Sequence, residues 1–414
     1  MLRGFTSEYL SEDGIDFLKS EYKYSCIDKS PISKYIMQPF WNWAIKLVPR
    51  SVAPNMLTFI GFLCAIVYPC LVAVQDPSYR SLPAPSWMSI VGGICVFMYQ
   101  LLDNLDGRQA RRKPKDWNLL TEDDKRAMKV TSLGSPAGQC MDHSMDALSC
   151  NFVMVGVALA LGAPPVQIIV IMFTTVVSFA VCNWEEYHTH SLYLGFINGP
   201  TEGLLLVSII EIYSGIAGVD FFYNTVFGYK LVDILIYFLA VGSLLTSVVS
   251  IVNVYKYYKT AISFNTYTTF WSAFPSIFQT VSFPLFGSIF VIIQHNIFEN
   301  GNIYENTALF CLAMAIPVSL AICDMIVCRV SGQYIPRASL LHYFNFIAYF
   351  IFIALQAFGF SVAKHTFAFL VGLVVFNLFM LVHFVVYVLK IMTRALNINV
   401  LTLTNDQKAF AAQF

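Results

Sequence analysis

Charged residues are scarce in this sequence of 414 residues. Asp, Glu, Lys and Arg make up 12% of the chain, whereas a soluble domain carries about 25%. This scarcity excludes an ordinary soluble globular protein, and the 57% of hydrophobic residues excludes a disordered chain. Positive and negative charges cancel, so the chain as a whole is not expected to bind polyanions. We therefore expect much of the chain to lie in lipid.

Cysteine motifs and a leader segment are also missing. The ten cysteines include no CxxC pair and lie mostly in apolar stretches, which indicates small buried side chains, not zinc ligands or a disulfide framework. The first forty residues contain no long apolar run, which is not typical of a signal peptide. We expect the N-terminus outside the bilayer and the first transmembrane helix as the targeting signal.

Long runs without Asp, Glu, Lys or Arg predict transmembrane helices, because about 20 apolar residues cross the hydrocarbon core. We predict an all-α polytopic membrane protein with ten spans. The runs cover 51–75, 81–102, 147–184 (divided by a Gly-Ala-Pro-Pro turn at 162–165), 234–255, 260–298, 306–323, 338–363 and 365–389. One more span is expected at 203–218, where Glu211 interrupts the apolar residues. The spans near Glu211 and Asp324 are the least regular, because these charges lie at membrane depth.

The distribution of positive charges supports an even number of spans. Only Arg80, Lys230 and Lys364 fall on the predicted lumenal loops, and all other Lys and Arg fall on cytosolic segments. Both termini are then cytosolic. Residues 32–47 place aromatic rings beside lysines, which predicts a short N-terminal interfacial helix or a cytosolic helix packed on the bundle.

The expected domain organisation follows from these spans. It comprises a cytosolic N-terminal segment with the interfacial helix (1–50), a catalytic half (51–218), C-terminal transmembrane helices (219–390) and a cytosolic tail (391–414).

Four aspartates near the predicted cytosolic ends of two consecutive spans are the strongest chemical signal. Asp103 and Asp106 are three residues apart, and Asp142 and Asp146 are four apart, so each pair shares one face of a helix. Four converging carboxylates repel one another unless cations neutralise them. Oxygen ligands suit hard divalent ions such as Mg²⁺ or Mn²⁺. The alternative, solvated charges at helix ends, explains a single pair but not two matched pairs.

These residues resemble the motif of a known family. DxxDGxxAR followed by GxxxDxxxD is similar to the motif of the CDP-alcohol phosphotransferases, with Asp103, Asp106, Gly107, Ala110, Arg111, Gly138, Asp142 and Asp146 at its fixed positions. Residues 53–58 resemble the APNxxT start of the first span in that family. The stretches WEEYHTH at 184–190 and GPTEG at 199–203 resemble the eukaryotic choline and ethanolamine phosphotransferases. The resemblance covers residues 20–395.

The resemblance implies a reaction. Phosphocholine or phosphoethanolamine is transferred from CDP-choline or CDP-ethanolamine to diacylglycerol, which releases CMP and forms phosphatidylcholine or phosphatidylethanolamine. Two ions, Mg²⁺ or Mn²⁺, held by the four aspartates, would clamp the pyrophosphate. His143 is the expected proton acceptor for the diacylglycerol hydroxyl, because it adjoins the site and its ordinary pKa is near neutrality. Asp146 is the alternative base.

The CDP-alcohol is expected to bind a group of residues at the same place: Asn55, Gly107, Ala110, Arg111, Gly138 and Gln139. Arg111 suits phosphate oxygens, and the small residues let a ligand or a backbone come close. The resemblance further implies an endoplasmic reticulum or Golgi membrane, with the active site on the cytosolic side and a homodimer as one possible assembly.

Two departures from the family pattern stand out. The family has eight residues between the arginine and the second glycine, and this chain has 26, of which 113–130 form a polar insertion. The insertion is either a passive loop or a lid over the nucleotide. Gln139 stands where the choline and ethanolamine enzymes usually have Glu, so a carboxylate that could orient His143 is missing from that position.

Rival interpretations remain open at this point. A polytopic transporter fits the spans and the membrane-depth charges, although no convincing inverted repeat supports it. A phosphatidylinositol-type synthase shares the motif, but such chains are typically shorter. His188 and His190 beside Glu185 and Glu186 suggest either a second metal site or a polar loop.

Overall fold

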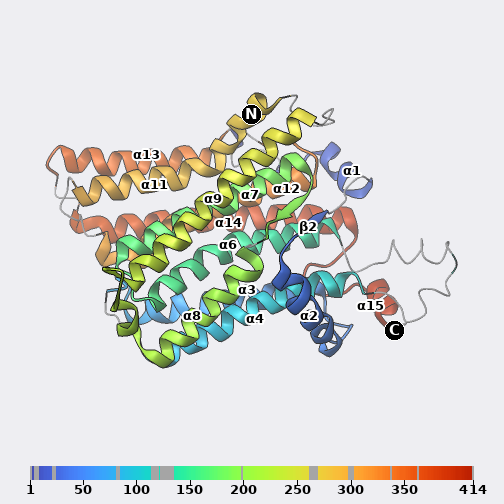
Figure 1. The fold of residues 1–414 in the computed structure, drawn as a ribbon. Helices are drawn as coiled ribbons and strands as arrows, with labels where there is room; N and C mark the ends of the chain where they lie inside the picture. Colours follow the sequence, from blue (N-terminus) through green and yellow to red (C-terminus); the bar gives the residue numbers. More distant parts are fainter. Residues whose placement is uncertain are drawn as a thin grey trace.

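The computed structural model of the protein describes residues 2–3, 9–20, 25–80, 84–112, 121, 135–196, 199–260, 269–296, 303–335, 338–360 and 363–412. The described chain is a bundle of long helices with strands of only two or three residues (Figure 1). The predicted all-α fold class is confirmed. The insertion at 113–130 lies outside the described residues, Thr121 apart.

Eight described helices are long and apolar enough to cross a membrane. They are α3 (Pro54–Gln75), α4 (Ser86–Ala110), α6 (Pro136–Ala160), α7 (Pro165–Thr189), α8 (Leu204–Ala217) with a π-helical turn before it (Gly199–Gly203), α9 (Leu231–Thr260), α12 (Thr307–Val330) and α14 (Thr366–Leu396). A ninth candidate is the pair of α10 (Phe270–Ala273) and α11 (Phe278–Asn296), which bends by 48°. The apolar helix α13 (Leu340–Ala357) occupies the predicted span at 338–363. The protein is therefore a multi-pass membrane protein.

Shorter elements complete the described chain. They are β1 (Leu2–Arg3), α1 (Glu12–Ser20), β2 (Cys26–Asp28), α2 (Gln38–Ala44), β3 (Leu192–Leu194), β4 (Thr225–Val226), β5 (Tyr229–Lys230), β6 (Ala338–Ser339) and α15 (Asn405–Ala412). Pairing is parallel between β1 and β6 and between β2 and β3, and antiparallel between β4 and β5. The ten cysteines all lie in the described residues, and none of them is part of a disulfide there.

Helix α12 lies at the centre of the bundle. Its residues are almost all buried, because it packs against α6, α7, α11 and α14. Side-chain hydrogen bonds support this packing: Ser319 Oγ donates to the carbonyl oxygen of Ala147 at 2.8 Å, and Asn345 and Asn377 exchange amide hydrogen bonds between α13 and α14. Lipid provides no hydrophobic force between helices, so such polar contacts and close packing hold the bundle together.

The helices that carry the predicted motif pack closely. A Cβ atom at Gly93 in α4 would lie 2.5 Å from the carbonyl oxygen of Ser208 in α8, so the two backbones touch there. Glu211 in α8 is fully buried against α3, α4 and α6, and Gly92 and Gly156 leave the space for its carboxyl group. The irregular span predicted at 203–218 is thus a helix whose charged residue faces protein, not lipid.

The turn between α6 and α7 explains why one long apolar run forms two helices. Gly162 has φ of 70°, a backbone conformation that side-chain-bearing residues rarely adopt, and a Cβ there would collide with Val219. Pro165 then begins α7 at a position where its missing N–H is not needed.

The segment predicted as an interfacial helix is helical throughout, with a π-turn, α2 and a 3-10 turn over Ser33–Leu47. Trp41 is buried against the bundle, whereas Tyr35, Ile36 and Trp43 are exposed. The guanidinium group of Arg108 lies 4.9 Å from the Trp41 ring and donates to Gln38, which ties this segment to α4. One face packs on the bundle and the other presents the aromatic rings that suit a headgroup layer.

The segments that connect the helices contact one another at each end of the bundle, as expected for a chain that crosses the membrane back and forth. At one end of the bundle, strand β2 of the N-terminal segment pairs with β3 after α7, and α1, α2 and α15 lie at this end (Figure 1). At the other end, Tyr223 Oη donates to the carbonyl oxygen of Gly162, and the Ala308 amide donates to that of Pro77. Each pair joins segments predicted to lie on the same side of the membrane.

Candidate metal and phosphotransfer site

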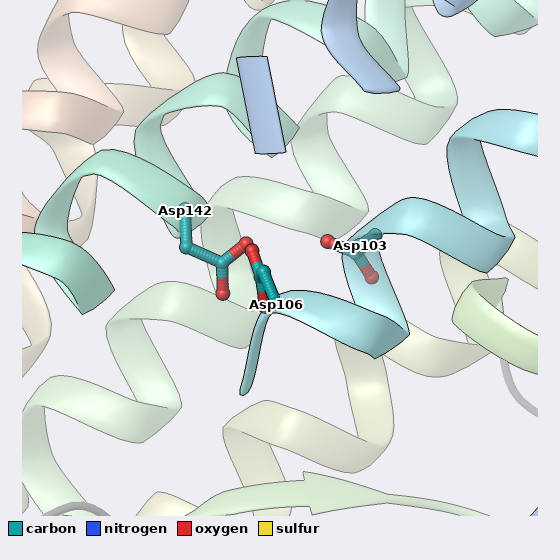
Figure 2. Close-up of side chains that lie close together, drawn as sticks. All are labelled: Asp103, Asp106 and Asp142. Atoms are coloured by element: carbon teal, nitrogen blue, oxygen red, sulfur yellow. The ribbon is translucent and has the colours of Figure 1, made fainter. Parts of the chain in front are cut away.

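Three of the four predicted aspartates come together between α4 and α6. One carboxylate oxygen each from Asp103, Asp106 and Asp142 lies within 4.8 Å of the others (Figure 2). The spacing of Asp103 and Asp106 places both on one face of α4, and the antiparallel α6 brings Asp142 to the same point. Asp106 is buried, and the other two side chains are partly buried.

Asp146 lies one turn further along α6 and is not part of this group of three. Its Oδ1 accepts a hydrogen bond of 2.6 Å from the hydroxyl group of Tyr99 in α4, and it interacts electrostatically with Asp103. The structure therefore places Asp146 beside the cluster, but with a protein partner of its own.

Two hydroxyl groups that hold these carboxylates were missed from the sequence. Thr58 Oγ1 in α3 donates to Asp106 Oδ2, and Tyr99 donates to Asp146. Helical spacing contained the signal: Thr58 is three residues after Asn55, and Tyr99 is four residues before Asp103. Three helices thus fix the carboxylates in place.

The cluster has the chemistry of a site for a hard cation. Asp142 Oδ1 is buried and has no hydrogen-bond partner among the described residues, which is costly unless another group meets it. Three mutually close carboxylates also repel one another without a cation between them. An all-oxygen donor set of this kind fits Mg²⁺ or Mn²⁺.

His143 follows Asp142 and faces a second buried group. Its Nδ1 lies 3.5 Å from Oε2 of Glu186 in α7, and Oε1 of Glu186 lies 2.9 Å from Nη2 of Arg329 in α12. All three side chains are at least mostly buried. Neither Glu186 nor Arg329 was predicted as a site residue, although Glu186 belongs to the WEEYHTH stretch.

The predicted CDP-alcohol residues also gather near the ends of α3, α4 and α6. Asn55 Oδ1 lies 3.1 Å from where a Cβ of Gly138 would be, so the small residue makes room for the amide group. Asn55 Nδ2 donates to the carbonyl oxygen of Val400, which brings the segment after α14 to this place. Ser135, which sequence analysis missed, caps α6 by accepting from the Gly138 amide at 3.0 Å.

The end of α4 carries the predicted phosphate-binding arginine. Gly107 leaves room for the guanidinium group of Arg111, which folds back over the helix: a Cβ at Gly107 would lie 2.8 Å from Nη2 of Arg111. Arg111 is exposed and Ala110 is the last residue of α4. Burial lowers the pKa of Arg112, and the positive charge of the nearby Arg50 lowers it further.

The structure also shows the surroundings of Gln139 and His188, the residues of two other predictions. Both amide atoms of Gln139 are buried and have no hydrogen-bond partner in the described chain, so Gln139 does not hold His143. His188 is fully buried, with Nδ1 2.9 Å from the hydroxyl of Tyr258 and Nε2 3.3 Å from that of Ser276. It packs in the bundle and forms no second acidic metal cluster within the described residues.

The sequence is similar to several curated proteins. It is 34% identical over 215 residues to choline/ethanolaminephosphotransferase 1 of Arabidopsis thaliana (51% of this chain, 49% of the relative). It is 35% identical over 201 residues to an uncharacterized CDP-alcohol phosphatidyltransferase class-I family protein of Schizosaccharomyces pombe (48% and 47%). It is 29% identical over 354 residues to human ethanolaminephosphotransferase 1 (81% and 80%). The chain thus spans about half the length of the plant and yeast relatives and four-fifths of the human one. No protein-family model matches the chain.

The fold and the site define a multi-pass α-helical membrane protein with a carboxylate cluster between two of its spans. The chain is a homologue of eukaryotic proteins named choline/ethanolaminephosphotransferase and CDP-alcohol phosphatidyltransferase class-I family protein.

Proposed function

We propose that the protein transfers phosphocholine, phosphoethanolamine or both from a CDP-alcohol to diacylglycerol, with phosphatidylcholine or phosphatidylethanolamine and CMP as products. The observation that carries this proposal is the meeting of Asp103, Asp106 and Asp142 from two helices, with a buried Asp142 oxygen that has no hydrogen-bond partner among the described residues. These residues belong to the motif that resembles the CDP-alcohol phosphotransferases, and homologues bear names of this activity.

The four aspartates would hold two divalent ions, Mg²⁺ or Mn²⁺. When bound, such ions neutralise the pyrophosphate charge and stabilise the attacking and leaving oxygens. Asp103, Asp106 and Asp142 would supply one group of ligands, and Asp146 would add its carboxylate from the next turn of α6.

The remaining site residues would bind and orient the CDP-alcohol. Arg111, exposed at the end of α4, pairs with phosphate oxygens. Asn55 and Gly138, which adjoin each other, would lie on the nucleotide side. Gly107, Ala110 and Gln139 would complete the binding site. Diacylglycerol enters laterally from the lipid.

Proton transfer would fall to His143. As the diacylglycerol hydroxyl oxygen bonds to the β-phosphorus, its proton passes to Nε2 of His143. The bond between that phosphorus and the bridging oxygen breaks, and the oxygen leaves with CMP. Asp146 is the alternative base, although its hydrogen bond from Tyr99 already uses one of its oxygens.

We place the protein in an endoplasmic reticulum or Golgi membrane, with the site on the cytosolic side. The bias of Lys and Arg toward the segments at the site's end of the bundle supports this orientation. The proposed catalytic half is 51–218, and it contains every site residue that was predicted from the sequence.

The test is an assay of purified protein in detergent with labelled CDP-choline and labelled CDP-ethanolamine, each with diacylglycerol. We expect the labelled phospholipid and CMP in equal amounts from at least one donor. A parallel reaction contains CDP-diacylglycerol as donor and labelled inositol as acceptor. Labelled phospholipid in that reaction alone would favour an inositol-type enzyme. Absence of any transfer, with uptake of a solute into proteoliposomes, would contradict the proposal in favour of a transporter.

A further inference from the structure

Glu186 lies in an unusual position for a carboxylate in a membrane bundle. It belongs to α7, yet its side chain, only 1% exposed, reaches His143 on α6 and Arg329 on α12. Its two oxygens are divided between these partners: Oε2 lies 3.5 Å from His143 Nδ1, and Oε1 lies 2.9 Å from Arg329 Nη2. One carboxylate therefore joins three helices at the side of the acidic cluster.

Stability alone does not explain this arrangement. A buried ion pair is often no more stabilising than apolar residues of similar volume, because both charges lose their water. Ionisable residues inside a membrane bundle generally mark a functional place. Apolar packing already joins α6, α7 and α12 along their lengths, so the pair is not needed to hold them together.

We propose that Glu186, held in place by Arg329, is a positioning residue for His143. In this role Glu186 accepts a hydrogen bond from the protonated Nδ1 of His143. This fixes the tautomer in which Nε2 carries no proton and can accept that of the diacylglycerol hydroxyl. A carboxylate behind a histidine commonly selects tautomer and ring orientation in this way. At 3.5 Å the contact is longer than an ordinary hydrogen bond, as catalytic contacts often are before substrate binds and shortens them. The inference rests on the proposed function, because it assumes that His143 is the base.

The same geometry gives a reason why Gln139 is tolerated. Gln139 offers His143 no carboxylate, but a carboxylate from α7 faces His143 instead. Gln139 itself has no hydrogen-bond partner among the described residues, so its neutral amide leaves the Glu186–His143 contact undisturbed.

The kinetic test compares Glu186→Gln with the parent enzyme. We expect kcat to fall by about 10- to 100-fold, the usual effect of losing such an outer partner, with the KM for the CDP-alcohol unchanged. In a His143→Ala background the same substitution should change kcat by less than about twofold, since the residue acts through His143. Glu185→Gln is the matched control: Glu185 is equally buried in α7, but it accepts from Asn253 and should tolerate the change.

A second variant separates positioning from folding. Glu186→Gln combined with Arg329→Met removes both charges and should recover thermal stability, while kcat stays low. Recovery of kcat in this double variant would overturn the proposal, and so would an equal loss of kcat with and without His143.

Spectroscopy keeps the inference independent of the assay. In NMR spectra of protein with ¹⁵N-labelled histidine, the signal of His143 is the one that disappears in His143→Ala. This signal should show a protonated Nδ1 in the parent and a changed tautomer in Glu186→Gln. An unmoved signal would overturn the positioning role. If the parent transfers no phosphoalcohol, the proposed function fails, and this signal still decides whether Glu186 sets the tautomer.

Discussion

Removing a single carboxylate from the acidic cluster is expected to abolish turnover. Asp106→Ala or Asp142→Ala takes away one oxygen ligand and unbalances the remaining charges, while the packing of α4 and α6 stays intact. The measurement is phospholipid formation, together with the elution profile in detergent. Asp220→Ala, an exposed aspartate at the other end of the bundle, is the control and should keep full activity. Full activity in EDTA, or in either cluster variant, would contradict the metal assignment.

His143→Ala is expected to lower kcat by about 100- to 10,000-fold, the share that a general base usually contributes. The KM for the CDP-alcohol should change little, because the imidazole acts on the diacylglycerol hydroxyl. Steady-state kinetics with both substrates varied measures this separation. His365→Ala, an exposed histidine after α13, serves as the control. If His143→Ala keeps the kcat of the parent, His143 is not the base and Asp146 takes that role.

At the scale of elements, the insertion between α4 and α6 can be tested by deletion. Deleting 113–130 joins Arg112 to Thr131 and restores the eight-residue spacing of the family. Arg112 donates to the Val48 carbonyl oxygen and Ser135 caps α6, so both flanking ends are held without the insertion. We expect kcat and KM to equal those of the parent, since loop length affects stability only logarithmically.

A replacement variant sharpens that experiment. Exchanging the 18 inserted residues for a Gly/Ser linker of equal length keeps the spacing but removes the sequence. If the segment is a lid over the nucleotide, the KM for the CDP-alcohol will rise in both variants, and the passive interpretation will be wrong.

The start of α6 differs from the start of the apolar run that hydropathy detects. The charge-free run begins at residue 147, but α6 begins at Pro136 and carries Asp142 and Asp146 within it, as their helical spacing predicted. Hydropathy detects contact with lipid, and these carboxylates face other helices. The break at 162–165 was predicted correctly, because glycine and proline act locally on the backbone.

At the scale of the whole molecule, both termini are expected on the cytosolic side. This topology can be measured with single cysteines introduced into a variant that lacks the exposed Cys26 and Cys70. The variants are studied in sealed vesicles whose cytosolic face is outward. Lys34→Cys should react with an impermeant thiol reagent in intact vesicles, whereas Arg80→Cys should react only after permeabilisation. Labelling of Arg80→Cys in sealed vesicles would contradict the predicted lumenal position of residue 80.

The sequence by itself determined the membrane-spanning helices and the acidic motif, because apolar runs, turn residues and helical spacing are local properties of the chain. The convergence of Asp103, Asp106 and Asp142 followed from two pairs on consecutive antiparallel helices. Only the tertiary structure decided which side chains surround them. Glu186 and Arg329 come from α7 and α12, and their contact with His143 depends on how those helices pack and rotate, which no local pattern specifies.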